Sequence, residues 1–247
     1  MIEIKLTKDY NLSGYTLIEG FPGLGLVGPM TNSYMIEKLK MEYIGYIDGD
    51  IFPPIATIHD GKPMFPIRLY KDDKYRIIVV IAEFAVPSTS ISFLAEELLG
   101  FIRKNKIGQI ISVGGIPVQK ISKNIYGTAS NDASIKKLKD AGITPINEGV
   151  VAGVSALLLT RCTSYKIPAI SVLVPVIATV MDPKYAEMAI LGLNKLINMD
   201  IDTEELEEES KEVQEKVKEL LKNAKETHQE YKNALDMASG EGPSTYA

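Results

Sequence analysis

The feature that most constrains the fold of this 247-residue chain is a series of short, mainly apolar segments in its first 200 residues. Three of them, at residues 15–19, 109–113 and 169–174, have apolar residues at adjacent positions, and helix-like segments separate them. Strands that are apolar on both faces are typical of a parallel sheet with helices packed on each side. We therefore expect one three-layer α/β/α body over residues 1–200.

A hairpin is expected within this body, and it makes the predicted sheet mixed, although still mostly parallel. Residues 64–70 and 75–82 are rich in β-branched and aromatic residues and flank a Lys-Asp-Asp-Lys turn. Another short strand is expected at residues 43–47.

Apolar spacing and cap residues predict the helices. They cover residues 27–39, a segment after Pro87 that includes residues 93–102, a short helix capped by Asn131 or Asp132, residues 152–165, and a segment from Pro183 to residue 198.

The composition is that of an ordinary globular protein, with 45% hydrophobic and 24% charged residues. A single cysteine excludes an internal disulfide and suits a reducing compartment. The N-terminal residues lack the continuous apolar stretch of a signal peptide. The longest apolar run, residues 167–181, contains two prolines and is shorter than the roughly 18 residues expected of a membrane span. We expect a cytoplasmic protein without a membrane partner.

The C-terminal part differs in kind from the body. Residues 202–238 contain 12 acidic residues and six lysines, and their apolar or small residues recur at alternating spacings of four and three. Such spacing predicts a long acidic helix over residues 201–238 with a heptad seam. Residues 239–247 have the Gly/Ser/Pro composition of a flexible tail.

Nucleic acid is not an expected partner of the chain, because no basic stripe in the sequence is interleaved with aromatic residues.

A glycine pattern near the N-terminus offers one specific functional hypothesis. Gly23-x-Gly25-x-x-Gly28 has the spacing of a dinucleotide-binding loop, and Asp48 follows at the distance of a ribose-binding carboxylate. Pro22, however, lies between the strand and the first glycine and removes one backbone donor that a phosphate would need. We therefore interpret the glycines as a turn for close packing of a helix on the sheet. A nucleotide- or nucleoside-binding enzyme stays open as the alternative.

Two carboxylates are expected at strand ends, where open α/β sheets bind ligands. Glu19 and Glu83 each follow an apolar strand, and the Gly114-Gly115 turn is expected to end a third strand nearby. These carboxylates could together line a polar pocket or could cap backbone donors, and we favour capping.

Other chemistry has little support in the sequence. Only two histidines are present, and His228 falls in the acidic segment. We interpret His59 as a surface turn residue and Cys162 as a buried thiol rather than as a catalytic pair. The histidines and the cysteine lack metal-ligand spacing. We expect no catalytic residue, no cofactor and no metal site, and hence no enzyme.

Several segments resemble a known family, the archaeal and bacterial relatives of proteasome assembly chaperones. The matching segments are EGFPGLGLVG at residues 19–28, GGIPV at 114–118, NEGVVAGVSALL at 147–158, and MDPKYAEMA at 181–189 running into IDTEEL at 201–206. The resemblance implies an α/β fold similar to purine nucleoside phosphorylases, no catalytic machinery, and assembly into homo-oligomers.

The resemblance also implies a partner. Archaeal members of this group are similar to proteasome assembly factors or ATP-independent proteasome activators, in which a C-terminal hydrophobic-Tyr-any motif enters pockets between α-subunits of the core proteasome. Thr245, Tyr246 and Ala247 match that motif, with threonine as a weak hydrophobic residue. We expect these three residues to bind the core proteasome.

Overall fold

The structure is a computed structural model of the chain, and it describes residues 2–120, 122–178, 180–204 and 206. The helix predicted over residues 201–238 lies almost wholly outside these residues. The tail predicted over residues 239–247 lies outside them altogether. Nearly all of the described residues therefore belong to the predicted α/β body.

A nine-stranded sheet forms the middle layer, in the order β1-β3-β6-β7-β2-β8-β11-β9-β10. The strands are β1 (Ile2–Leu6), β2 (Thr16–Glu19), β3 (Glu42–Gly49), β6 (Ile67–Asp72), β7 (Ile77–Ala82), β8 (Gln109–Pro117), β9 (Tyr126–Ala129), β10 (Thr144–Pro145) and β11 (Ala169–Val176). The central strands β7, β2, β8 and β11 are mutually parallel. Antiparallel pairs flank this centre, among them the predicted β6–β7 hairpin, so the prediction of a mixed sheet is confirmed.

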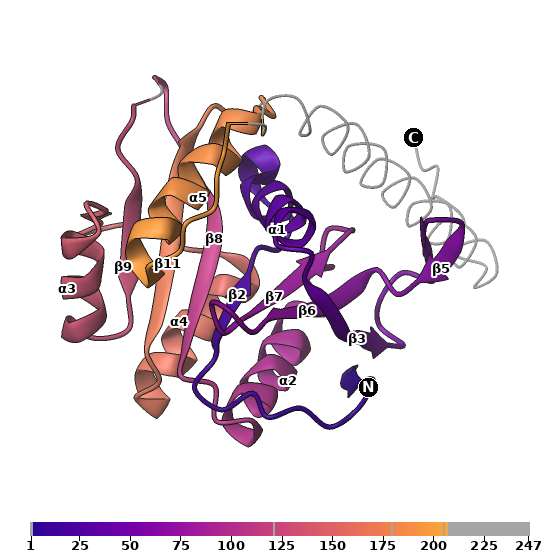
Figure 1. Cartoon of the computed structure of the whole chain (residues 1–247). Coiled ribbons are helices and arrows are strands. Elements are labelled where there is room, and N and C mark those ends of the chain that lie inside the picture. The colour runs from indigo at the N-terminus through magenta and orange to yellow at the C-terminus, as the bar shows by residue number, and fades with distance from the viewer. Residues whose placement is uncertain (1, 121, 179, 205, 207–247) are drawn as a thin grey trace, which may run out of the picture.

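Helices cover both faces of the sheet, which confirms the three-layer α/β/α architecture. The helices are α1 (Val27–Lys38), α2 (Ile91–Lys104), α3 (Asp132–Asp140), α4 (Gly153–Tyr165) and α5 (Pro183–Ile197). One apolar core lies between the sheet and α1, α3 and α5, and the other lies between the sheet and α2 and α4. Figure 1 shows α1 beside α5, and α3 next to β9.

Local sequence signals stabilise the ends of several helices. Asn131 Oδ1 accepts a hydrogen bond from the Ser134 amide at 2.9 Å, so Asn131 is the cap of α3. Asp182 caps α5 in the same way, and Pro183 occupies the first turn, where its missing N–H costs nothing. Arg103 and Lys104 in the last turn of α2 complement the negative end of its dipole.

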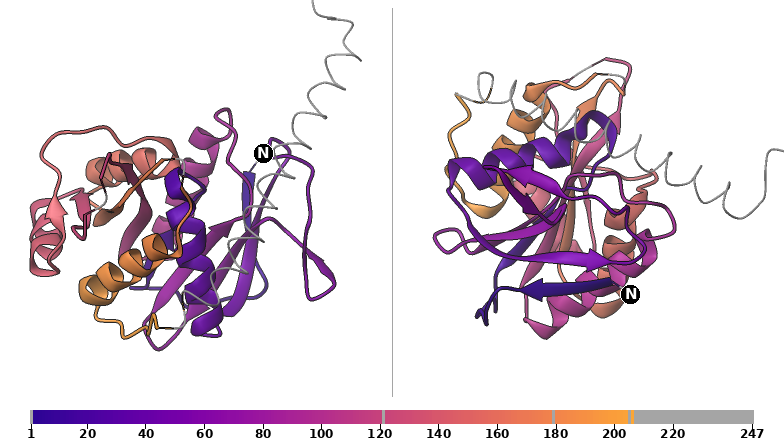
Figure 2. Two further views of the ribbon diagram at one scale, coloured as in Figure 1. Left: turned by 90° about the horizontal axis from the view of Figure 1, so that it is seen from above. Right: turned by 90° about the vertical axis from the view of Figure 1, so that its right-hand side faces the viewer.

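The structure corrects the sequence analysis at several strands. Strand β8 does not end at Gly114-Gly115 but continues to Pro117, because its parallel pairing with β11 persists through both glycines. Strand β1 forms one edge of the sheet, as Figure 2 shows, and was not predicted. Strands β9 and β10 at the other edge were not predicted either. A separate small hairpin, β4 (Thr57–His59) and β5 (Lys62–Met64), projects beyond the main sheet (Figure 1).

Candidate functional site

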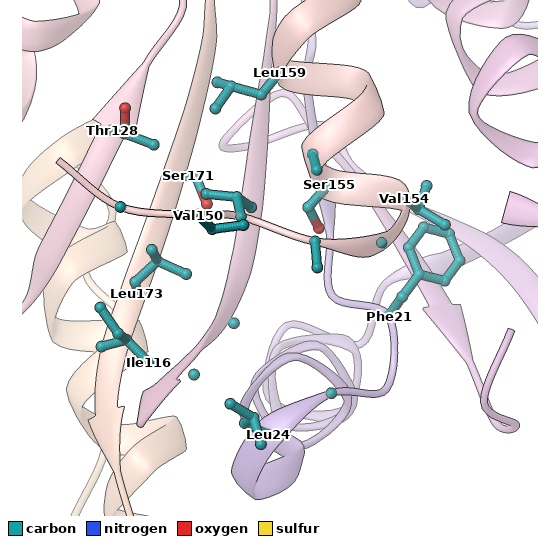
Figure 3. A pocket seen from close by; sticks show the side chains of 18 of the residues that line it. Phe21, Leu24, Ile116, Thr128, Val150, Val154, Ser155, Leu159, Ser171 and Leu173 are labelled. Carbon is teal, nitrogen blue, oxygen red and sulfur yellow. The ribbon is translucent and has the colours of Figure 1, made fainter. Parts of the chain in front are cut away.

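A cavity of about 650 Å³ lies beside the carboxyl ends of β2 and β8 and the middle of β11, on the side of the sheet covered by α2 and α4 (Figure 3). Residues 21–24, 113–117 and 146–156 form most of its wall. Three of the segments that carry the family resemblance, at residues 19–28, 114–118 and 147–158, therefore meet at one place. This is where the sheet geometry predicts a ligand site.

The cavity wall is mainly apolar. Phe21, Leu24, Ile116, Val150 and Leu173 surround the space in Figure 3. Val150 is 96% exposed and Leu24 is 41% exposed, so apolar side chains also lie at the surface of this region. No lysine or arginine is among the described residues that line the cavity. Such a wall suits a ligand with an apolar body better than one with several phosphate groups.

The glycine pattern beside the cavity is used for packing. A Cβ on Gly28 would lie 2.5 Å from the Cα of Gly20, so strand β2 and helix α1 approach with backbone against backbone. Gly25 has φ +65 and faces Val176 and Tyr185, where a Cβ would meet the Val176 side chain at 3.0 Å. These contacts confirm the packing interpretation for Gly25 and Gly28, whereas a Cβ on Gly23 would meet only Phe21 O, at 3.8 Å.

The acidic residue of the supposed nucleotide motif is also misplaced. Asp48 lies on β3, which β6 and β7 separate from β2 in the sheet. Its side chain accepts a hydrogen bond from the Gly49 amide at 2.8 Å. A dinucleotide-binding unit needs this carboxylate on the strand next to the glycine loop.

A row of polar residues crosses the sheet at the floor of the cavity. Glu19 on β2, Ser112 on β8, Ser171 on β11 and Thr128 on β9 are successive register partners and share the face covered by α4. Ser171 and Thr128 line the cavity, whereas Glu19 is fully buried beside it. The row is thus partly covered by protein and partly open to a ligand.

Glu19 is a carboxyl without a charged partner among its interactions. Burial raises its pKa, against the weaker opposing effect of hydrogen bonds from the Ser112 and Ser155 hydroxyls and the Phe21 amide. The Phe21 amide lies 3.4 Å from Glu19 Oε2, which partly agrees with the predicted capping role. Oε1 has no hydrogen-bond partner in the described part of the chain. Glu19 therefore carries its proton more readily than an exposed glutamate does.

Glu83 has a different role, and it does not join Glu19 in a pocket. Its Oε2 accepts a hydrogen bond from Arg68 Nη1 at 2.8 Å, and its Oε1 lies 2.9 Å from His59 Nε2. The same Arg68 nitrogen donates to Thr57 Oγ1 at 2.9 Å. Because His59 and Thr57 belong to β4, this cluster attaches the β4–β5 hairpin to the main sheet. Glu83 thus binds side chains rather than the backbone donors that we expected.

Burial and ion pairing act in opposite directions on Glu83. Burial alone would raise the pKa of its carboxyl, but the hydrogen-bonded Arg68 guanidinium, with support from Thr57 and His59, holds that pKa below its ordinary value. His59 is consequently more than the surface turn residue that the sequence indicated. Its side chain is 40% exposed and shares a buried carboxylate with Arg68.

Cys162 is a core residue, as predicted. It lies in α4 with no exposed surface, and burial raises the pKa of its thiol to about 11.

Within the described ranges, no group of three or more His, Cys, Asp or Glu residues is placed to hold a metal ion. None of the helices in the same ranges is both long and apolar enough to cross a membrane.

Sequence reasoning missed Ser112, Thr128, Ser155 and Ser171, the small polar residues around the cavity. Each is an ordinary residue in its own segment, and only the strand register and the position of α4 bring them together. The predicted partner-binding residues Thr245, Tyr246 and Ala247 lie outside the described residues, and their role stays a prediction.

Comparison with known proteins gives consistent results. A protein of Methanocaldococcus jannaschii without an assigned function is 30% identical over 195 residues, covering 79% of this chain and 80% of that one. Among solved structures, Pyrococcus furiosus PbaA, an archaeal homologue of proteasome-assembly chaperone, has a TM-score of 0.80 at 24% identity and covers 92% of this chain and 99% of its own. Pyrococcus furiosus PbaB, an archaeal proteasome activator, has a TM-score of 0.71 at 24% identity, covering 89% and 98%.

The structural matches share the α/β/α fold over nearly the whole of the described chain. The family is established separately, by a sequence model that matches residues 17–221. This range contains the glycine turn, all the strands around the cavity and the segment that leads into α4. The chain belongs to the PAC2 family.

Proposed function

We propose that this protein is a non-enzymatic proteasome assembly chaperone or ATP-independent proteasome activator. The observation that carries the proposal is the fold shared with PbaA and PbaB, one a homologue of proteasome-assembly chaperone and the other a proteasome activator. Membership of the PAC2 family supports it. The partner is the core proteasome, and docking is on the ring of α-subunits.

The proposed docking element is the segment Thr245-Tyr246-Ala247. Tyr246 offers rigid apolar area and a hydroxyl that can form a hydrogen bond at the rim of a pocket. Thr245 contributes little apolar area, so each tail binds weakly by itself.

Weak individual tails are sufficient if the protein forms a homo-oligomer, and we include self-association in the proposal. Once one tail is bound, the others are held at a high effective concentration near equivalent pockets, and avidity strengthens binding without any new type of contact. Light scattering of the purified protein tests this step. A monomer at all concentrations would contradict it.

Co-sedimentation with archaeal core proteasome tests the docking element. The full chain and a variant lacking residues 245–247 are compared at equal concentration, after circular dichroism has shown equal folding. The full chain should sediment with the proteasome and the truncated chain should not. Equal sedimentation of the two would contradict docking through this segment, and no sedimentation of either would contradict the proteasome as partner.

Two activity assays separate the chaperone from the activator. An activator raises peptide hydrolysis by mature core proteasome in the absence of ATP. A chaperone instead raises the yield of core particles assembled from separate α- and β-subunits. Each assay is run with the full chain and with the chain lacking residues 245–247.

A further inference from the structure

The cavity on the α4 side of the sheet has features of a ligand site that docking through residues 245–247 does not use. Its volume of about 650 Å³ is within the range of small-molecule sites in proteins. Its wall brings together the turn after β2, the end of β8 and the start of α4.

The first polar feature of the cavity is the beginning of helix α4. Ala152 is the residue before the helix, and no side chain caps it. The first four amides at a helix start have no partner within the helix, and here they belong to residues 152–155, all of which line the cavity. These amides, with the positive end of the helix dipole, favour an acceptor that carries negative charge.

The second polar feature is Ser171 on the floor of the cavity. Its side chain lines the cavity, and the residue is only 1% exposed. Among the described residues its Oγ has no hydrogen-bond partner. A buried hydroxyl without a partner costs free energy, and a ligand oxygen placed beside it would remove that cost.

The charges around the cavity disfavour a ligand with several negative charges. The described lining has no lysine or arginine, and Glu148 on its wall would repel an anion with several charges. Glu19, which accepts a hydrogen bond from the Ser155 hydroxyl, does not add to this repulsion while it holds its proton, which its burial favours. The remaining lining is apolar and would bury a hydrocarbon or aromatic group.

We propose that this cavity binds a small monocarboxylic acid with an apolar body. The carboxylate accepts hydrogen bonds from the uncapped amides at the start of α4 and from the Ser171 hydroxyl. The apolar body lies among Phe21, Leu24, Ile116 and Leu173. The site is a binding site, and no bond in the ligand is made or broken.

Calorimetric titration of the full-length protein tests the proposal. The probes are octanoate, 3-phenylpropanoate and indole-3-acetate, each compared with its neutral primary amide. At least one acid should bind, and it should bind about fivefold or more tightly than its amide, because only the acid gains from the helix terminus. Absence of binding for all three acids at millimolar concentration, or equal binding of acid and amide, would overturn the proposal.

Variants locate the binding. Ser171→Ala should weaken acid binding about tenfold or more through the loss of a hydrogen bond to a charged group. It should not destabilise the protein, because the hydroxyl has no partner to lose. Ser164→Ala, an exposed serine near the other end of α4, is the matched control and should leave binding unchanged. Equal effects of the two substitutions would overturn the assignment to Ser171.

Two further experiments test whether the acids bind in the cavity and whether a small molecule is the preferred ligand. Leu173→Trp fills the cavity and should abolish binding of the acids, and retained binding would contradict the location. The tripeptide Thr-Tyr-Ala also joins an apolar group to a carboxylate, so it is titrated beside the free acids. Tighter binding of the tripeptide than of any free acid would contradict a small molecule as the ligand.

Discussion

Gly20 and Gly28 are in direct backbone contact: a Cβ on Gly20 would lie 2.6 Å from the Gly28 Cα, and one on Gly28 would lie 2.5 Å from the Gly20 Cα. This contact joins the end of the central strand β2 to the first turn of α1 and fixes the direction of the turn between them. The same turn forms one wall of the cavity. A sequence pattern typical of phosphate binding is therefore used to place a helix on a sheet.

Gly28→Ala should destabilise the protein, because the added methyl group meets backbone atoms that cannot move independently. We expect a loss of about 1–3 kcal/mol in the free energy of unfolding, measured by urea titration. Gly100→Ala is the matched control, since Gly100 lies within α2 and an added Cβ there meets no atom within 4 Å. The control should gain about 0.5–1 kcal/mol from higher helix propensity. Similar effects of both substitutions would refute the packing role of Gly28.

Glu83→Gln should destabilise the protein strongly, because it leaves the buried Arg68 guanidinium without its anionic partner. Breaking a buried ion pair from one side costs about 3–5 kcal/mol. Glu96→Gln removes an exposed carboxylate that pairs with Arg161 and should cost less than about 1 kcal/mol. Urea unfolding at neutral pH compares the two variants. A loss for Glu83→Gln as small as that of the control would show that the cluster does not hold the β4–β5 hairpin.

The same ion pair predicts how stability depends on acidity. The folded-state pKa of Glu83 lies below its usual value of 4.5. The stabilisation is therefore fully present above pH 4.5 and is lost as the pH falls through the lower folded-state pKa. The difference in unfolding free energy between the native protein and Glu83→Gln should shrink as the pH is lowered below 4.5. A difference that stays constant down to the acid transition would contradict this assignment.

Glu19 should show the opposite dependence. Its folded-state pKa is raised above the usual 4.5, so the folded protein keeps a proton that the unfolded chain has released. Its contribution to stability is greatest below pH 4.5 and is lost as the pH rises through the folded-state pKa. Relative to the native protein, Glu19→Gln should therefore become progressively more stable as the pH rises across that range. Parallel stability profiles for the two proteins would show that Glu19 is not held protonated.

Much of the fold follows from local sequence signals. The apolar strands, the hairpin and the five helices of the body were predicted because apolar periodicity, caps and prolines act within a few residues. Edge strand β1 was missed although Ile2, Ile4 and Leu6 alternate with polar residues, a pattern that indicates a strand. Strands β9 and β10 are too short for periodicity to identify them.

The site was less predictable, since it depends on register and strand order. Nothing local to Ser171 indicates that it lies beside Ser112 and Thr128, because these pairings join segments distant in sequence. The contact of Glu83 with His59 likewise requires the β4–β5 hairpin to fold back on the sheet, whereas its pairing with Arg68 follows from the register of the β6–β7 hairpin. The cavity lies near the strand ends where open α/β sheets bind ligands, but the sequence could not identify the residues that line it.

Thr245→Leu should strengthen binding to the core proteasome, because leucine supplies the apolar area that threonine lacks at the first position of the motif. Burial of the additional methyl and methylene groups should tighten binding about three- to tenfold. Surface plasmon resonance with immobilised core proteasome measures the change. Unchanged or weaker binding would indicate that this position does not enter an apolar pocket.

The most direct test of the proposed function is the dissociation constant of the full-length protein for core proteasome, compared with that of Tyr246→Ala. The substitution removes the aromatic ring and hydroxyl while leaving the body of the protein unchanged. The proposal predicts that the full-length protein binds and that Tyr246→Ala loses at least about tenfold in affinity, as expected for a buried aromatic anchor. Equal dissociation constants for the two proteins would contradict docking through Tyr246.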